Sequence, residues 1–170
     1  DKFPLAILVA QTEQGLVANH VPLMLHDKQE LLGHLALNND LHQLLPSGKE
    51  ILAIFRGEDA YISPNWYPTK PIHHRHVPTW NYQVVHVYGT IHYQDDDKSK
   101  LAVVGKLTKK MEERTHGENA WRMADAPKDY LNAMLANIIA FRIEITRILG
   151  KSKVSQNRET VDFGNVAKVL

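Results

Sequence analysis

The sequence has 170 residues, with 20 Lys and Arg, 19 Asp and Glu, ten His, no cysteine and a formal net charge of +1. This length supports one well-buried core and is short for two domains. The balanced charge gives no electrostatic footprint for nucleic acid or an anionic membrane, and the lack of cysteine excludes disulfides, thiolate metal sites and a cysteine nucleophile. Neither a membrane-length apolar run nor a leader-like start is present, so we expect a cytoplasmic protein.

The first third of the chain alternates apolar runs of strand length with short polar turns. The run at residues 3–10 is continuous and rich in β-formers, which is typical of a strand buried on both faces. A leucine-rich amphipathic segment follows the third run, and Asn38 or Asn39 can cap it as a helix. We expect strands over residues 3–10, 16–25, 30–37 and 50–56 and a short helix over residues 38–45.

One amide falls on the apolar face of the second predicted strand. Asn19 alternates with Val17 and Val21, which places all three side chains on one side. A buried amide without a partner costs about 1 to 3 kcal/mol. Asn19 is therefore either a structural bridge or a ligand contact.

Residues 60–82 carry a high density of aromatic, hydroxyl and amide side chains. Four prolines (64, 68, 71 and 78) disfavour helix and central strand, so we expect a preorganised loop. Its rings can stack on a flat ligand whose edge the polar groups hydrogen-bond; alternatively, they cover one end of the fold. The side chains concerned are Tyr61, Ser63, Asn65, Trp66, Tyr67, Thr79, Trp80, Asn81 and Tyr82.

The second half of the chain predicts a long strand, two helices and a last strand. Residues 83–94 alternate with period two, as in a half-buried antiparallel strand. Acidic residues 95–97 open one helix and Pro127 a second, residues 141–146 form the last strand, and a short tail starts at about residue 155. Consecutive strands without βα alternation indicate a mainly β, antiparallel barrel with flanking helices, as a single domain over residues 1–170.

Three histidines crowd one segment, at His73, His74 and His76. Adjacent side chains point apart in an extended segment, and no carboxylate or cysteine lies near, so we expect no metal site. Ser63 lacks the glycine-flanked elbow of a serine nucleophile, and the glycines are too scattered for a phosphate-binding loop. A phosphate would need Lys or Arg side chains and backbone amides.

Several motifs together resemble the PaiB family, described as FMN-binding negative transcriptional regulators. The resemblance implies an FMN-binding split barrel, a six-stranded antiparallel Greek-key barrel that forms a homodimer with the flavin at the subunit interface. One departure is the histidine-rich insert at residues 71–76, which affects the mouth of the expected pocket. The motifs are Ala18-Asn-His-Val-Pro22, Gly33-His-Leu-Ala36 with Asn39, Ala60-Tyr-Ile-Ser-Pro-Asn-Trp-Tyr67, Val77-Pro-Thr-Trp-Asn-Tyr82 and Ser155-Gln-Asn-Arg158.

The resemblance also implies a set of cofactor-binding residues. Positional analogy with split-barrel relatives gives Asn19, His20, His34, Leu35, Asn38 and Asn39. The aromatic motifs give Ser63, Trp66, Tyr67, Lys70, Thr79, Trp80, Asn81 and Tyr82, and the C-terminal motif gives Gln156, Asn157 and Arg158. Among the candidate phosphate ligands Lys70, Arg75 and Arg158, we rank Arg158 first because a guanidinium can bind phosphate through two parallel hydrogen bonds.

Three functions follow from these expectations. The first is a flavin-dependent redox or sensor protein, with a nicotinamide or another small redox partner, in which no residue is assigned as catalytic. The second is a transcriptional regulator that acts through a partner, because direct nucleic-acid binding is disfavoured. The third is a heme-binding or heme-degrading split barrel, for which the candidate axial ligands are His20, His34, His73, His74 and His86.

Overall fold

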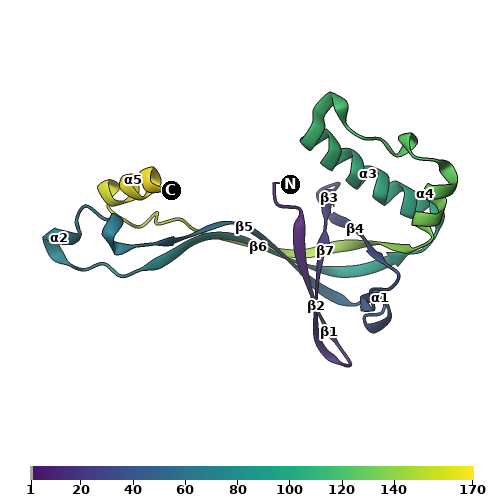
Figure 1. Cartoon of the computed structure of the whole chain (residues 1–170). Coiled ribbons are helices and arrows are strands. Elements are labelled where there is room, and N and C mark those ends of the chain that lie inside the picture. The colour runs from purple at the N-terminus through teal and green to yellow at the C-terminus, as the bar shows by residue number, and fades with distance from the viewer. Residues whose placement is uncertain (1) are drawn as a thin grey trace. The chain divides into compact units, whose positions relative to one another are not determined.

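The computed structural model describes residues 2–170 (Figure 1). The strands are β1 (Leu5–Thr12), β2 (Gly15–Pro22), β3 (Met24–His26), β4 (Glu30–Ala36), β5 (Glu50–Ile62), β6 (Thr79–Gln94) and β7 (Ile138–Lys153). The α-helices are α1 (Leu41–Leu44), α2 (Lys70–His73), α3 (Asp97–His116), α4 (Lys128–Leu135) and α5 (Thr160–Val169). Short 3-10 turns lie at Pro64–Trp66, Gly117–Asn119 and Met123–Asp125. None of the helices in this part of the chain has both the length and the apolar character needed to cross a membrane.

The strands belong to one sheet with the order β2-β1-β5-β6-β7-β4-β3. The pairs β1–β2, β1–β5, β3–β4 and β4–β7 are antiparallel, which confirms a mainly β fold with flanking helices. The sheet has seven strands and is not closed, so the six-stranded barrel is not confirmed. The additional strand arises because the predicted strand over residues 16–25 breaks after Pro22, where the backbone N–H of Leu23 donates instead to the carbonyl of Pro4 at 2.8 Å.

The chain divides into two compact units. Unit 1 comprises the residues up to Phe55 together with His86–Ile148, and unit 2 comprises Arg56–Val85 and Leu149–Leu170. Strands β5, β6 and β7 contribute residues to both units.

Unit 1 contains the main hydrophobic core. In β1 the side chains of Ala6, Leu8 and Ala10 are buried, whereas Ile7 and Val9 between them are only half-buried. The expectation of a strand buried on both faces is therefore wrong, because only one face of β1 meets the core. The core also receives side chains from β2, β4, β5, β6, β7 and α1: Val21, Leu31, Leu35, Leu41, Leu45, Ile51, Ala53, Val87, Ile91, Ile139, Phe141 and Ile143.

Helix α3 covers part of the sheet in unit 1 (Figure 1). Its Val103 and Leu107 pack with Leu32 of β4 and Ala140 of β7 in a second apolar cluster. The helix begins as the sequence predicts, since the Asp96 carboxylate accepts the backbone N–H of Ser99 at 2.9 Å.

A glycine permits close packing between β4 and β7. Gly33 lies opposite Phe141 in the β4–β7 register. A methyl group at Gly33 would lie 2.6 Å from Phe141 Cζ and 2.6 Å from Leu23 Cδ2, which is closer than carbon atoms can pack. The absence of a side chain at this position thus makes room for the Phe141 ring.

Unit 2 differs from the sequence prediction at both ends of the aromatic segment. Residues 60–62 finish β5 and residues 79–82 begin β6, so the predicted loop over residues 60–82 is wrong at its ends. Pro64 and Pro71 lie in the first turns of the 3-10 turn at Pro64–Trp66 and of α2, where a missing N–H does no harm. The prediction of an unstructured tail from about residue 155 is also wrong in part, because residues 160–169 form α5.

The interior of unit 2 is small and mixed in polarity. Its apolar cluster consists of Ile62, Tyr67 and Val166, with Ala60 and Trp66 packed against it. Polar residues are buried beside this cluster: Thr69, Asn81, Ser155 and Asp162.

Candidate functional site

The predicted cofactor residues fall into two sets, one in each unit. The set in unit 1 lies on β2, β4 and the turn into α1: Asn19, His20, His34, Leu35, Asn38 and Asn39. The set in unit 2 lies on the aromatic segment, the start of β6 and the turn before α5: Ser63, Trp66, Tyr67, Lys70, Thr79, Trp80, Asn81, Tyr82, Gln156, Asn157 and Arg158. Each set has its own geometry.

In unit 1 two predicted amides bind each other. The Nδ2 group of Asn39 donates to Oδ1 of Asn19 at 2.7 Å. Oδ1 of Asn39 also accepts the backbone N–H of Leu41, the first residue of α1, at 3.0 Å, but the N-cap residue is Asp40, so the expected cap by Asn38 or Asn39 is wrong. Asn19 thus makes a structural bridge to Asn39, and its role as a ligand contact stays a prediction.

The other predicted residues of unit 1 face different directions. His34 and Leu35 are consecutive on β4, so their side chains project from opposite faces of the sheet. Leu35 lies in the core with 4% exposure, which leaves only its backbone for a ligand. His20 and Asn38 are exposed.

His34 stands out because of its buried ring nitrogen. Its Nδ1 is inaccessible to solvent and has no hydrogen-bond partner. Burial lowers the pKa of His34 below its ordinary value, because the positive charge of a protonated ring would lose its solvation. The imidazole is therefore neutral at physiological pH and keeps an uncommitted nitrogen.

In unit 2, strand geometry separates the predicted residues at the start of β6. Thr79 and Asn81 project from one face and Trp80 and Tyr82 from the other. Asn81 is buried and its Oδ1 accepts the hydroxyl of Ser155 at 2.9 Å. The four side chains therefore cannot all contact one flat ligand.

Two aromatic rings at the paired ends of β5 and β6 remain accessible. Tyr61 and Trp80 are 47% and 53% exposed, and their rings meet edge to face with centroids 5.8 Å apart. Lys153 supports this position from β7, because its Nζ donates to Thr79 Oγ1 and, at 2.8 Å, to the carbonyl of Trp80. An exposed aromatic pair of this kind can bind a flat ligand or another protein surface.

Two of the predicted residues between β5 and the start of α2, Ser63 and Lys70, bond to Asn65, whereas the buried Tyr67 hydroxyl has no hydrogen-bond partner within residues 2–170. Ser63 Oγ accepts the backbone N–H of Asn65 at 3.2 Å, and Lys70 Nζ donates to Oδ1 of Asn65 at 2.5 Å. The carbonyl of Trp66 accepts Nδ2 of Asn165 at 2.8 Å, which ties α5 to the loop. These contacts stabilise the loop and commit Ser63 and Lys70 locally.

A buried polar chain connects α5 to the aromatic segment. The Thr69 hydroxyl donates to Asp162 Oδ2 at 2.7 Å, and the Thr69 backbone N–H lies 3.2 Å from Oδ1. His76 Nε2 is 2.8 Å from the same hydroxyl oxygen, and His76 Nδ1 is 3.4 Å from Nη1 of Arg158. The guanidinium of Arg158 also lies over the Tyr67 ring, 4.9 Å from its centroid.

The carboxylate at the end of this chain is completely buried. Burial alone would raise the pKa of Asp162, but the hydrogen bonds from the hydroxyl and the backbone N–H of Thr69 favour the charged form, and the net pKa lies below the ordinary value. Asp162 is therefore ionised at neutral pH and can only accept hydrogen bonds.

The turn before α5 is built around Ser155. Its φ of +63° places a non-glycine residue in the left-handed region, while its hydroxyl holds Asn81 and its carbonyl accepts the backbone N–H of Arg158 at 3.0 Å. Gln156 closes the turn, with Oε1 accepting from Val154 at 2.8 Å and Nε2 donating to Ser152 at 2.9 Å. Asn157 is exposed.

Sequence reasoning missed Thr69, His76, Lys153, Ser155 and Asp162 as members of this site. The Thr69–Asp162 bond joins residues 93 positions apart, so no local spacing reveals it. Within residues 2–170, no group of three or more potential ligands is arranged to hold a metal ion.

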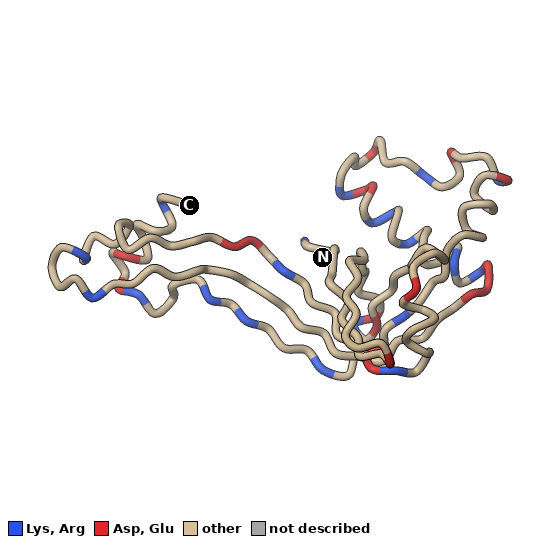
Figure 2. Tube along the Cα trace, turned by 60° about the horizontal axis from the view of Figure 1, so that its bottom comes forward, with Lys and Arg blue, Asp and Glu red and all other residues tan. Residues whose placement is uncertain are grey.

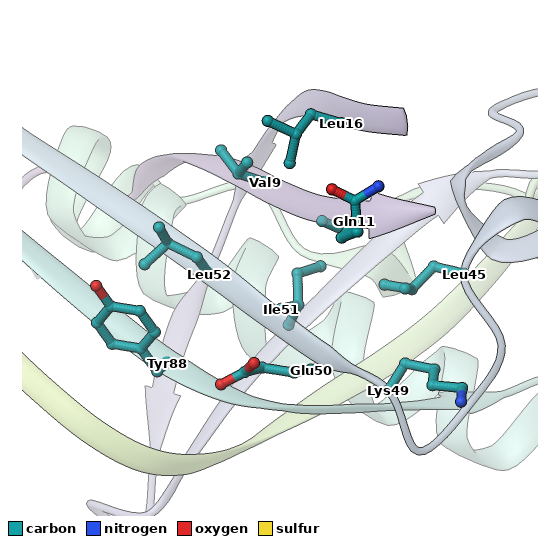
Figure 3. Close-up of a pocket in the computed structure, with 10 residues that line it drawn as sticks. Val9, Gln11, Leu16, Leu45, Lys49, Glu50, Ile51, Leu52 and Tyr88 are labelled. Atoms are coloured by element: carbon teal, nitrogen blue, oxygen red, sulfur yellow. The ribbon is translucent and has the colours of Figure 1, made fainter. Parts of the chain in front are cut away.

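A separate open groove of about 400 Å³ lies across β1, β5 and β6 in unit 1 (Figure 3). Val9, Leu16 and Leu52 supply apolar surface, and Gln11 and Glu50 supply polar groups. None of the predicted cofactor residues lines this groove.

Comparison with known proteins supports the resemblance seen in the motifs. The profile of the family described as "Putative FMN-binding domain" matches residues 1–147. The protease synthase and sporulation protein PAI 2 of Bacillus subtilis is 33% identical over 167 residues, which cover 95% of this chain and 76% of that protein. An uncharacterized protein of Saccharomyces cerevisiae is 39% identical over 111 residues, covering 62% of this chain and 66% of that protein.

Solved structures share the fold at low sequence identity. The FAD- and heme-binding protein of Mycobacterium smegmatis has a TM-score of 0.64 at 15% identity and covers 98% of this chain and 72% of that one. The flavocytochrome Anf3 of Azotobacter vinelandii has a TM-score of 0.63 at 12% identity, covering 95% of this chain and 68% of that one.

Proposed function

Because the chain belongs to the PaiB family of FMN-binding domain proteins, we propose that it binds FMN and acts as a flavin-dependent redox or sensor protein. The observation that carries this proposal is the family match over residues 1–147. The split-barrel likeness to flavin-binding structures agrees with it at the level of the fold. When bound, a flavin supplies hydride or electron transfer, and the protein orients its ring.

The residues of unit 2 fit two parts of FMN. Tyr61 and Trp80 offer exposed aromatic faces of the kind on which an isoalloxazine ring stacks. Arg158 uses one guanidinium N–H toward His76, and no other hydrogen bond of this guanidinium is found within residues 2–170. Its remaining donors suit a phosphate, which it would hold in two parallel bonds.

We further propose that the protein is a homodimer. The apolar interior of unit 2 is a cluster of three residues, yet several large apolar side chains of this unit are exposed: Tyr61, Ile72, Val77, Trp80, Val161 and Phe163. A second subunit that covers part of this surface would remove it from water. Light scattering at micromolar concentration should give twice the chain mass, and a monomeric mass would exclude a site shared between subunits.

We propose that a regulatory role would act through a partner protein or through the flavin and not through direct DNA contact. Basic and acidic residues are interspersed along the chain (Figure 2), and the net charge of +1 leaves little counterion release to drive DNA binding. We expect no specific complex with promoter DNA at physiological salt in a gel-shift assay. A complex at nanomolar protein would instead favour direct repression.

Heme binding is the second candidate, and His34 is the observation that favours it. Its neutral imidazole with an unpaired buried nitrogen has the chemistry of an axial ligand, although Nδ1 would have to become accessible. The absorbance spectrum after addition of FMN or hemin separates the two cofactors. A Soret band that shifts on binding and is lost in His34→Ala would favour heme.

Flavin titration is the direct test of the first proposal. We expect saturable quenching of FMN fluorescence, with Trp80→Ala weakening both FMN and riboflavin and Arg158→Ala weakening FMN alone. Losing a charge-assisted phosphate contact should cost about 1.5 to 3 kcal/mol, or roughly ten- to a hundredfold in affinity. Arg56→Ala is the matched control, because Arg56 is exposed in the same unit and is not among the candidate phosphate ligands. Absence of binding by either flavin would refute the proposal.

A further inference from the structure

The hydrogen-bond donors and acceptors around His76 specify which ring nitrogen donates and which accepts. Ionised Asp162 only accepts, so the single hydroxyl proton of Thr69 must point to Asp162 Oδ2, 2.7 Å away. The Thr69 oxygen then has only lone pairs to offer His76 Nε2 at 2.8 Å, and this nitrogen must carry a proton. On the other side, Arg158 has only donors, so His76 Nδ1 must be unprotonated to accept from Nη1.

These contacts favour one arrangement of His76, with a proton on Nε2 and a lone pair on Nδ1. A proton on Nδ1 would face the N–H groups of Arg158 and turn an attractive contact into one between two donors. Two neighbouring rings also restrict the orientation of the His76 ring. The centroid of Tyr67 lies 4.6 Å from that of His76, and the centroid of His73 lies 4.7 Å from it. His76 therefore presents a lone pair in a fixed direction.

Four ionisable side chains surround His76: Asp162, Arg158, His73 and, beyond His73, Glu159. Asp162 approaches His76 Nε2 to 3.5 Å, and Arg158 faces Nδ1. His73 lies beside the ring and is itself 3.9 Å from the Glu159 carboxylate. The side chain of His76 is only 5% exposed, so these neighbours rather than solvent set its hydrogen bonding.

We propose that His76 is a positioning residue that, held by Thr69 and Asp162, orients the guanidinium of Arg158 to bind the phosphate of FMN. The proposal rests on the function proposed above. Two contacts fix the guanidinium: the lone pair of His76 at one edge and the Tyr67 ring under its plane. The remaining N–H groups stay in a fixed direction, which lowers the entropy lost when they close on a phosphate.

Substitution of Thr69 gives the sharpest test, because it removes the hydroxyl that bonds His76 and Asp162 and leaves the side chains of His76 and Arg158 themselves unchanged. Thr69→Val keeps the shape but lacks the hydroxyl, and Thr69→Ser restores the hydroxyl without the methyl group. We expect Thr69→Val to weaken FMN roughly three- to tenfold, the value of one net hydrogen bond, with riboflavin affinity unchanged. Thr69→Ser should recover most of the FMN affinity, and Thr160→Val, an exposed threonine on α5, should change neither ligand.

A spectroscopic measurement tests the same arrangement without any ligand. In nitrogen-15 NMR spectra at pH 8, we expect His76 of the wild-type protein to show the Nε2–H tautomer, and Thr69→Val to show a mixture of both tautomers. A predominant Nδ1–H tautomer in the wild type would overturn the proposal. So would a Thr69→Ser variant that is folded by circular dichroism but binds FMN as weakly as Thr69→Val.

The outcome also distinguishes this inference from the proposed function. If Arg158→Ala lowers FMN affinity and Thr69→Val does not, Arg158 binds phosphate without help from His76 and the positioning role is refuted. If wild-type protein binds FMN and riboflavin equally, the phosphate assignment of Arg158 fails and the positioning role fails with it. The tautomer measurement would then still report whether the chain from Asp162 to Arg158 exists.

Discussion

The two units are held together by different interactions. Unit 1 buries a continuous set of aliphatic and aromatic side chains from its strands and from α1, and α3 adds a second apolar cluster. Unit 2 buries only Ile62, Tyr67 and Val166 as an apolar cluster. Four of the six buried polar or charged residues found within residues 2–170 belong to unit 2.

This difference predicts different responses to substitution. Apolar burial stabilises a unit through many interchangeable contacts, whereas a buried hydrogen-bond chain depends on every member having its partner. Loss of one polar partner in unit 2 should therefore loosen a whole segment locally, while loss of apolar volume in unit 1 should lower the stability of the fold as a whole.

The largest effect is expected for Phe141→Ala in unit 1. Phe141 is fully buried opposite Gly33, and its removal would leave a cavity that the surrounding strands fill only partly. We expect a loss of about 3 to 5 kcal/mol in the free energy of unfolding, measured by urea denaturation. The control Phe163→Ala on α5 removes a ring that is 43% exposed and should cost less than about 1 kcal/mol. Equal losses would contradict the comparison.

A smaller and local effect is expected for Asp162→Asn in unit 2. The amide of Asn keeps one acceptor oxygen but replaces the other with an NH2 group, so one of the two Thr69 donors loses its acceptor and docking of α5 should weaken by roughly 1 to 3 kcal/mol. Hydrogen exchange of the α5 backbone amides at pH 7 measures this loss. Asp129→Asn on α4, at an exposed position, should leave α5 protected as in the wild type.

Asp162 should also make the docking of α5 depend on pH, with weaker docking at low pH. Because the pKa of Asp162 in the folded protein lies below its ordinary value of 3.8, its stabilisation is fully present above that value and is lost as the pH falls through the lower folded pKa. Amide resonances of α5 should thus keep their docked positions at pH 5 and shift only below about pH 4. A transition near pH 6 would assign the pH response of α5 to another group.

The sequence predicts unit 1 far better than unit 2, for physical reasons. Periodic apolar residues identify the strands and α3 because each repeats one local rule over many positions. The repeat also singles out Asn19, a polar residue that interrupts it, but it does not reveal that Asn39 is the partner of this amide. By contrast, burial of Asp162 depends on Thr69, a residue 93 positions away, and no local pattern encodes that contact.

The candidate site shows the same limit. Motifs singled out Tyr67, Trp80 and Arg158, and the structure does bring Tyr67 and Arg158 together. The motifs did not reveal that strand alternation separates Trp80 from Asn81, because proline content suggested a loop there. A proline restricts its own residue and its neighbour, so Pro78 is compatible with a strand that begins at Thr79.

The smallest expected effect probes the one polar bridge that unit 1 does contain. Asn39→Ala removes the bond to Asn19 and the bond to the first backbone N–H of α1, but both amides are only half-buried, so water can replace part of what is lost. We expect a loss of about 1 kcal/mol in urea denaturation, at the lower end of what two hydrogen bonds contribute together. The neighbouring Asn38→Ala, at an exposed position, should change stability by less than about 0.5 kcal/mol. If Asn39→Ala instead destabilised unit 1 as strongly as Phe141→Ala, the polar bridge and not the apolar core would hold β2 to α1, and the distinction between the two units would have to be abandoned.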